Sequence, residues 1–185
     1  MISHIVGKKY FANHPACLST SLCDSIITHA ECQGFIPATL NDGSLDLNFR
    51  NCGRCITFNC FHSDVVAAIS DFLPRTYRQR KLIGINHCFR ILKYKAGQFF
   101  NAHYDDPIRL PIGRTELTVM IYLNENYEGG QTTFVHDTSV DEFSEQRLRQ
   151  KTGDMLIFDH GILHKGEEVF NGIKYVLRTD VIYSK

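Results

Sequence analysis

The chain has 185 residues, of which 43% are hydrophobic and 22% are charged, and its 20 Lys+Arg balance its 20 Asp+Glu. This length and composition are typical of one globular domain with its own core, and they exclude a disordered or fibrous protein. A formal net charge of +0 provides no long-range field that would attract nucleic acid or an anionic membrane, so neither is an expected partner.

The cysteine content and the N-terminus bear on the compartment. Residues 1–15 lack the basic start, apolar core and small-residue cleavage site of a secretory signal. No stretch approaches the length of an apolar membrane span. An odd number of cysteines in a chain large enough to fold without disulfides favours a reducing compartment. We therefore expect a soluble, cytoplasmic protein whose seven cysteines are mostly free thiols: Cys17, Cys23, Cys32, Cys52, Cys55, Cys60 and Cys88.

Two helices are predicted in the first half of the chain. The first covers residues 20–33, where serine and threonine can cap the start and Gly34 follows the end. The second covers residues 64–73, with Ser63 as its cap and Pro74 as its stop. Both have apolar residues at helical spacing, which indicates packing helices.

A cluster of possible metal ligands lies between these helices. In NCGRCITFNCFH, Cys52, Cys55, Cys60 and His62 have the spacing C-x2-C-x4-C-x-H, and a zinc ion accepts all four ligand types. The spacing matches no common zinc module. A structural zinc site or a redox pair is one interpretation, and free cysteines in a strand region is the preferred one.

From residue 87 the hydrophobic period changes from 3.6 towards 2. Turn signals at Ala96-Gly97, Gly129-Gly130 and Asn171-Gly172 separate several of the expected strands. These strands cover residues 87–94, 98–105, 116–124, 131–135, 153–159 and 174–183. Two helices before a run of strands predict an α+β protein in which the helices support an antiparallel sheet of a sandwich or small barrel.

The strand at 98–105 ends in the sequence FFNAHYDD. In an extended segment side chains alternate, so His103 and Asp105 share one face while Tyr104 and Asp106 lie on the other. Such a pair can hold a metal ion, act as an oriented acid/base couple, or be an ordinary polar surface. A third ligand would have to come from GDMLIFDHGILHKGEEV, which contains His160 and His164. Two histidines and one carboxylate with open positions are the donor set of non-haem Fe(II) oxygenases.

From about residue 89 to the C-terminus the chain resembles the Fe(II)- and 2-oxoglutarate-dependent dioxygenases, in particular the prolyl 4-hydroxylase-like branch. Three blocks carry the resemblance, in the family's order and spacing: FRILKYKAGQFFNAHYDD, LTVMIYLNENYEGGQTTF and KTGDMLIFDHGILHKGEEVFNGIKYVLRTDVIY. The resemblance implies a double-stranded β-helix (jelly-roll) core supported by the N-terminal helices. It also implies a single dioxygenase domain over residues 1–185, with helical support and flanking strands in 1–86 and the metal-binding core in 87–185.

Residue by residue, the resemblance makes His103, Asp105 and His164 the iron ligands. His160 is the rival for the third place, but only His164 precedes a glycine by two residues, as the family pattern asks. For Tyr104 and Asp106, on the opposite strand face, the default interpretations are a packed ring and a solvated carboxylate.

The resemblance also assigns the binding of 2-oxoglutarate. Lys174 matches the basic anchor for the far carboxylate of the prolyl hydroxylase branch, and Arg178 matches the wider spacing of related dioxygenases. Arginine has the better fork for a carboxylate, but a tight hairpin at Asn171-Gly172 would bring Arg178 close to the metal, so Lys174 is slightly favoured and both stay open. Tyr122 and Tyr94 match tyrosines of the co-substrate pocket, although on residue type alone each would be a core aromatic. Thr118 and Met120 share the face of Tyr122 and are expected to line the same cavity.

The implied reaction is oxidative decarboxylation of 2-oxoglutarate to succinate and carbon dioxide, coupled to hydroxylation of a C–H bond by dioxygen, with ascorbate as a possible reductant. The resemblance favours a peptide or protein side chain such as proline as the substrate. The segment DPIRLPIGRTE, with Arg109 and Arg114, is a candidate substrate loop. A small-molecule hydroxylase of the same chemistry and a non-catalytic metal-binding β-barrel are the alternatives.

Overall fold

The computed structural model describes residues 2–6, 9–40, 42–136 and 144–185. The helices are α1 (Thr20–Gln33) and α2 (His62–Ile69), the latter continued by a 3-10 turn, η1 (Ser70–Phe72). The strands of the first half are β1 (Ile2–Val6), β2 (Lys9–His14), β3 (Ile36–Pro37), β4 (Gly53–Phe58), β5 (Thr76–Tyr77), β6 (Arg80–Ile85) and β7 (Cys88–Lys95). Those of the second half are β8 (Phe100–His103), β9 (Arg109–Leu110), β10 (Gly113–Tyr122), β11 (Tyr127–Gly129), β12 (Thr132–His136), β13 (Ser144–Leu148), β14 (Met155–Asp159), β15 (His164–Gly166) and β16 (Val169–Ser184).

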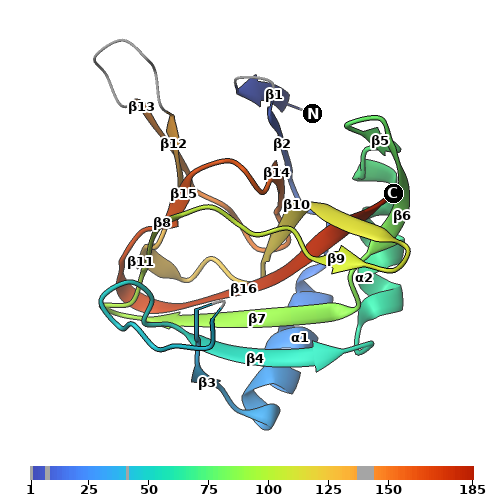
Figure 1. The fold of residues 1–185 in the computed structure, drawn as a ribbon. Helices are drawn as coiled ribbons and strands as arrows, with labels where there is room; N and C mark the ends of the chain where they lie inside the picture. The colour runs from blue at the N-terminus through green and yellow to red at the C-terminus, as the bar shows by residue number, and fades with distance from the viewer. Residues whose placement is uncertain (1, 7–8, 41, 137–143) are drawn as a thin grey trace.

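Within the described ranges, the strands form two antiparallel sheets. The large sheet has the order β1-β2-β14-β10-β16-β7-β4-β3, with the shorter β5, β6, β9 and β11 attached to it, and the small sheet has the order β13-β12-β15-β8. Figure 1 shows the small sheet facing the long strands β16 and β7, with α1 on the other side of the large sheet. Two facing antiparallel sheets agree with a jelly-roll fold.

The alternation along β10 shows how the sequence separates two apolar layers. Leu117, Val119 and Ile121 join the larger core cluster, which also contains Ile26 of α1 and Ile69 of α2. Tyr122, on the opposite face, joins a second cluster with Phe134 of the small sheet. Because side chains alternate in a strand, one face of β10 packs on the helices and the other faces the space between the sheets.

The first helix is confirmed residue for residue. The side chain of Ser19 accepts a hydrogen bond from the Leu22 amide at 3.3 Å and caps the start of α1. Gly34 follows the last residue at φ 84°, in the left-handed region, and its N–H donates to the Ala30 carbonyl at 3.0 Å. This conformation favours glycine, which explains why the helix ends there.

The predicted start of the second helix is wrong. The helix begins at His62, so Ser63 lies inside it rather than capping it, and no side chain caps its first turn. A tight turn precedes it, in which Asn59 and Phe61 have φ of 64° and 59°. The turn therefore sets the start and the direction of the helix. The prediction relied on a capping side chain and so placed the start too late.

The predicted hairpin at Asn171-Gly172 is also wrong. Both residues lie inside β16 and pair with β11, Gly172 opposite Tyr127 and Asn171 opposite Glu128. Gly172 has φ +80°, and a Cβ atom built on it would lie 2.6 Å from the Asn126 carbonyl oxygen. Glycine is needed at this position because two strands of a sheet approach each other closely, and not because the chain turns there.

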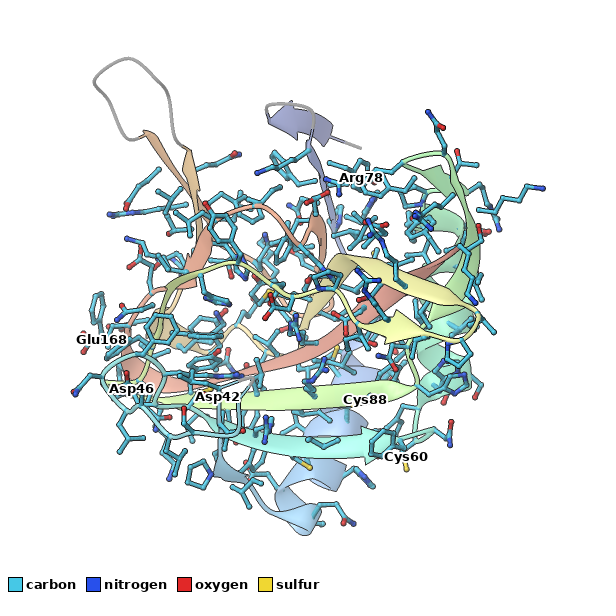
Figure 2. All side chains as sticks on the ribbon, in the orientation of Figure 1. Asp42, Asp46, Cys60, Arg78, Cys88 and Glu168 are labelled. Atoms are coloured by element: carbon cyan, nitrogen blue, oxygen red, sulfur yellow. The ribbon has the colours of Figure 1, made fainter. Side chains whose placement is uncertain are left out.

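The cysteine cluster does not form a metal site. Cys52 packs in one apolar cluster with Tyr94, whereas Cys55, three residues on, packs in the larger cluster on the opposite face of β4. Cys60 is exposed, and Figure 2 labels it near Cys88 at one end of the β4–β7 pair. All seven cysteines are free thiols, as expected. In the described part of the chain, no helix is long and apolar enough to span a membrane.

Candidate active site

The small sheet brings His103 and His164 together. His103 ends β8 and pairs with His164, the first residue of β15, and their ring centroids lie 4.3 Å apart. Gly166 pairs with Phe100, so two residues of β15 span three residues of β8. This bulge breaks the strict alternation expected of the strand, and the Phe100 ring stacks on His103 at 3.6 Å.

Asp105 follows β8 and completes a three-residue group. Its Oδ1 lies 3.9 Å from His103 Nε2 and its Oδ2 lies 3.7 Å from His164 Nε2. One ligand atom from each of the three residues lies within 4.8 Å of the others, and the described residues contain no second group of this kind. Two imidazoles and one carboxylate thus converge on one point, as the alternation of His103 and Asp105 predicted.

Backbone carbonyls fix the orientation of both imidazoles. His103 Nδ1 lies 2.7 Å from the Asn101 carbonyl oxygen, and His164 Nδ1 lies 2.9 Å from the Ile162 carbonyl oxygen. Because a carbonyl oxygen only accepts, each Nδ1 carries the proton, and each Nε2 presents a lone pair towards Asp105. This second-sphere arrangement is typical of histidines that hold a metal ion.

Asp105 is held as a carboxylate by two neighbours. Arg178 Nη2 lies 2.7 Å from Oδ1, and the Thr118 hydroxyl donates to Oδ2 at 2.5 Å. Burial by itself would raise the pKa of Asp105, but the Arg178 charge, followed by His164 and the Thr118 hydrogen bond, holds that pKa well below its usual range. Each oxygen keeps lone pairs for a further partner. Thr118 was expected only to line the cavity, and its contact with Asp105 depends on tertiary structure.

The imidazoles are neutral at physiological pH. Burial, followed by the neighbouring His164, lowers the pKa of His103 to about 3. Burial likewise lowers the pKa of His164. Metal ligation needs deprotonated donors, and two neutral imidazoles with one carboxylate fit Fe(II). The residues present therefore suit the iron ion that the donor set implies.

His160 does not join this group. Its Nε2 lies 3.5 Å from Asp180 Oδ1, and the residue is buried. Its backbone carbonyl accepts the Asp105 amide at 3.0 Å, so His160 contacts the site through its main chain. Of the two candidate histidines, the structure brings His164 to the other ligands.

A cavity of about 460 Å³ opens beside the three residues and extends to Lys174. The Lys174 side chain is only 2% exposed, and its Nζ donates to the Gly130 carbonyl at 2.5 Å. Rings of Tyr122, Tyr94 and Tyr127 surround the ammonium at 5.3, 5.4 and 6.0 Å. No carboxylate lies within 4.0 Å of it among the residues that the structure describes. Burial lowers the pKa of Lys174 to about 8.

Arg178 is placed differently from Lys174, although both lie on one face of β16. It pairs with Asp105 at 2.7 Å and with Asp180 at 3.5 Å. Of the two tyrosines expected near the co-substrate, Tyr94 lines the cavity. The Tyr122 ring is buried against Lys174, and its hydroxyl shares a hydrogen bond of 2.5 Å with Thr132 Oγ1. Met120 lines the cavity, as expected.

The predicted substrate loop meets the cavity only at its beginning. Asp106, Pro107 and Ile108 line the cavity, whereas Arg109 and Arg114 do not. These arginines face each other in the β9–β10 pair, and Arg114 Nε binds Glu116 at 2.5 Å. The assignment of this segment as a substrate loop stays a prediction, with its first residues rather than the two arginines at the cavity. The expectation of a packed ring is wrong for Tyr104, which is 58% exposed and lines the cavity.

Two facing antiparallel sheets, with two histidines and one carboxylate beside a cavity, define the class of jelly-roll non-haem iron oxygenases. Residues 89–179 match the sequence profile described as the 2OG-Fe(II) oxygenase superfamily. This match, over about half of the chain, supports a 2OG-Fe(II) oxygenase that is prolyl 4-hydroxylase-like.

Individual relatives agree with this assignment. A PKHD-type hydroxylase of Pseudomonas fluorescens (strain Pf0-1) is 34% identical over 89 residues, which are 44% of this chain and 37% of that protein. The matches therefore span less than half the length of such curated relatives.

Solved structures support the fold. A prolyl hydroxylase from Trichoplax adhaerens, in complex with a hypoxia inducible factor peptide fragment, superposes with a TM-score of 0.73 at 17% identity, over 93% of this chain and 83% of that one. A viral collagen prolyl hydroxylase from Paramecium Bursaria Chlorella virus-1, as a 2OG complex, has a TM-score of 0.68 at 22% identity, over 98% of this chain and 100% of that one. At such identities the likeness shows the fold alone.

Proposed function

We propose that this chain is an Fe(II)- and 2-oxoglutarate-dependent dioxygenase that hydroxylates a C–H bond, with a peptide or protein side chain such as proline as the substrate. The observation that carries the proposal is the pairing, in one cavity, of a convergent two-histidine, one-carboxylate group with a buried lysine that has no carboxylate partner among the described residues. The histidine–carboxylate group fits the iron, and the buried lysine fits one carboxylate of a dicarboxylic co-substrate.

In this proposal His103 Nε2, His164 Nε2 and an Asp105 oxygen hold the iron. When bound, Fe(II) and 2-oxoglutarate would supply the oxidising chemistry, in which one oxygen atom of dioxygen goes into succinate as the keto acid loses carbon dioxide and the other goes into the hydroxyl group of the product. The chain's own part is to hold and orient. Arg178 and Thr118 keep Asp105 ionised and in position, and Phe100 stacks on His103.

Lys174 is the proposed anchor for the far carboxylate of 2-oxoglutarate. A buried ammonium without a counter-ion is unfavourable, and a ligand carboxylate would offset its desolvation. Arg178 already has two carboxylate partners, which is why it is the weaker choice. Tyr94 and Tyr122 would confine the ligand chain between the iron and Lys174, with their rings against the ammonium.

The remaining features belong to the same proposal. We place the activity in a single domain over residues 1–185, in which α1 and α2 support the jelly-roll core. A cytoplasmic location is proposed from the seven free cysteines, and ascorbate is proposed as a supporting reductant. Proline is the first substrate to test, because structural neighbours with this fold are named as prolyl hydroxylases. A small-molecule substrate for the same chemistry is the second candidate, because loops determine substrate choice in such folds.

Turnover and binding together test the proposal. Purified protein with Fe(II) and ascorbate is expected to convert 2-oxoglutarate into succinate, at least slowly without the second substrate. In the absence of dioxygen, the Fe(II)-loaded protein should bind 2-oxoglutarate. Iron retention without either property would support the non-catalytic metal-binding alternative and refute the dioxygenase.

A further inference from the structure

Two arginines that the proposed function does not use also line the cavity. Arg54 lies on β4 opposite Leu92 of β7, and Arg50 precedes β4 and forms an isolated bridge with Phe100. Both side chains line the same cavity as His103 and Asp105. They come from the part of the chain outside the matched stretch 89–179.

The contacts of these two arginines leave their charges uncompensated. Arg50 donates to the Thr39 carbonyl at 3.4 Å and lies near Cys52 Sγ at 3.4 Å, and Arg54 donates to Thr39 Oγ1 at 3.1 Å. The buried Nε of Arg54 has no hydrogen-bond partner among the described residues. Within the described ranges, neither guanidinium has a carboxylate within 4.0 Å. Burial, followed by the charges of Arg50 and Arg90, lowers the pKa of Arg54.

Of the other cations of the cavity, all but Lys174 have carboxylate partners. The cavity is lined by three carboxylates and by six basic side chains. The basic side chains are those of Arg50, Arg54, Arg90, Lys165, Lys174 and Arg178. Arg90 and Arg178 share Asp180, and Arg178 also binds Asp105. Lys165 pairs with two glutamates outside the cavity. On the proposed function, Lys174 takes the co-substrate. Arg50 and Arg54 are therefore the two cations of this cavity to which neither a described carboxylate nor the co-substrate is assigned.

Carboxylates near the arginines in sequence do not compensate them. Asp42 and Asp46 precede Arg50 in the same connection, at the end of the β4–β7 pair away from Cys60 (Figure 2). Asp42 accepts hydrogen bonds from the amide and hydroxyl of Ser44, and Asp46 accepts the Asn48 amide. Both are exposed and engaged with their own turn.

One aromatic ring links the arginines to the metal ligands. The Arg50 guanidinium lies 4.4 Å from the centroid of the Phe100 ring, and that ring stacks on His103 at 3.6 Å. A group bound by Arg50 would therefore be part of a molecule that also reaches the site of reaction. Guanidinium groups prefer planar oxyanions, which they bind through charge-assisted hydrogen bonds.

From these contacts we propose that Arg50 and Arg54 form an anion subsite for the substrate, which carries a carboxylate or a similar oxyanion beside the C–H bond that reacts. That the bound molecule is the substrate rests on the proposed function, whereas the anion subsite is inferred from the two arginines alone. The acid is either a side chain of a peptide or the free carboxylate of a small molecule, and the same two arginines would bind both.

Anion binding can be measured without turnover. We would titrate inorganic phosphate into Fe(II)-loaded protein saturated with 2-oxoglutarate, without dioxygen, and follow the heat of binding. Arg50→Gln and Arg54→Gln should each weaken phosphate binding about 10- to 150-fold, the loss expected for a charge-assisted hydrogen bond. Arg75→Gln is the matched control, because Arg75 is exposed, lies outside the cavity and loses the same charge. Equal affinity in all three variants, or no binding to the wild-type protein, would overturn the subsite.

Folding is controlled with a conservative variant. Arg54→Lys keeps the charge, so it should retain more phosphate affinity than Arg54→Gln, with near-ultraviolet circular dichroism like that of the wild type. If Arg54→Lys binds as weakly as Arg54→Gln although both are folded, charge is not what binds the anion and the proposal fails.

Two pairs of probes distinguish the sources of the acid. A blocked peptide, acetyl-Ala-Glu-Pro-Ala-amide, is compared with its Gln counterpart, and free L-proline is compared with L-prolinamide, by their competition with phosphate at the same site. If the Glu peptide competes better than its Gln counterpart, the carboxylate belongs to a side chain of a peptide substrate. If L-proline competes better than L-prolinamide, it is the free carboxylate of a small molecule. Neutral probes that compete equally well in both pairs would overturn the proposal. Loss of 2-oxoglutarate binding would instead refute the proposed function, since the phosphate titration does not depend on turnover.

Discussion

Replacing Lys174 by methionine should stabilise the protein while it removes co-substrate binding. Lys174 is only 2% exposed, and among the described residues its ammonium makes a single hydrogen bond, to the Gly130 carbonyl. Burial lowers its pKa from 10.5 to about 8. Methionine has a similar length, carries no charge and fits among the three tyrosine rings around Nζ.

The magnitude follows from the linkage between protonation and folding. A pKa of about 8 in the folded state against 10.5 in the unfolded state corresponds to about 3.4 kcal/mol of destabilisation. This cost is fully present below pH 8, because lysine is protonated in both states there, and it disappears as the pH rises from 8 to 10.5. Losing the hydrogen bond to Gly130 offsets about 1 kcal/mol. We expect Lys174→Met to gain about 2 kcal/mol near pH 7.

Chemical denaturation of the metal-loaded protein without 2-oxoglutarate measures this gain, with Lys81→Met as the matched control. Lys81 is exposed on β6, so the control should change stability by less than about 0.5 kcal/mol. Saturating 2-oxoglutarate should reverse the order, because ligand at 100 times its Kd stabilises the wild type by about 2.7 kcal/mol and leaves the variant unchanged. A destabilised Lys174→Met protein that still binds 2-oxoglutarate with wild-type affinity would refute the assignment of Lys174.

Three further outcomes are expected. His103→Ala or Asp105→Ala should abolish iron retention and succinate formation, and His160→Ala should cost much less activity than His164→Ala; the reverse order of the two histidines would show that the wrong one was chosen. The affinity for 2-oxoglutarate should be flat below pH 8 and fall about tenfold per pH unit above it, as Lys174 loses its proton, and a flat profile up to pH 10 would exclude a titrating lysine anchor. Gly113→Ala should lower the unfolding free energy by at least about 2 kcal/mol, since a Cβ there would lie 1.9 Å from the Tyr183 carbonyl oxygen; an unchanged melting temperature would contradict this.

Local sequence determined the elements whose signals lie within a few residues. The Ser19 cap and Gly34 define α1 because both act on neighbouring backbone groups. The period-2 pattern located most strands of the second half, and the spacing of His103 and Asp105 placed both on one side because alternation is a local property of an extended chain.

Elements whose cause lies elsewhere in the chain could not be predicted in this way. The Asn171-Gly172 pair looks like a turn, yet β11 pairs with it and continues the strand. The bulge in β8 turns Phe100 onto His103 only because β15 has one residue fewer to pair with it. The choice of His164 over His160 followed family spacing, and a single sequence offers no physical reason for it.

Tertiary structure likewise determines which charged side chains at the site are paired. The family resemblance proposed two cations four residues apart on one strand, with Lys174 slightly favoured over Arg178 and both left open. Folding pairs Arg178 with Asp105 and leaves Lys174 buried without a described carboxylate partner, so the two have different chemistry. Arg50 and Arg54 share a cavity with the proposed iron ligands only when β4 joins β7, a contact between segments about 40 residues apart. Which charges remain unpaired depends on such distant neighbours, because electrostatic interactions act through space and not along the sequence.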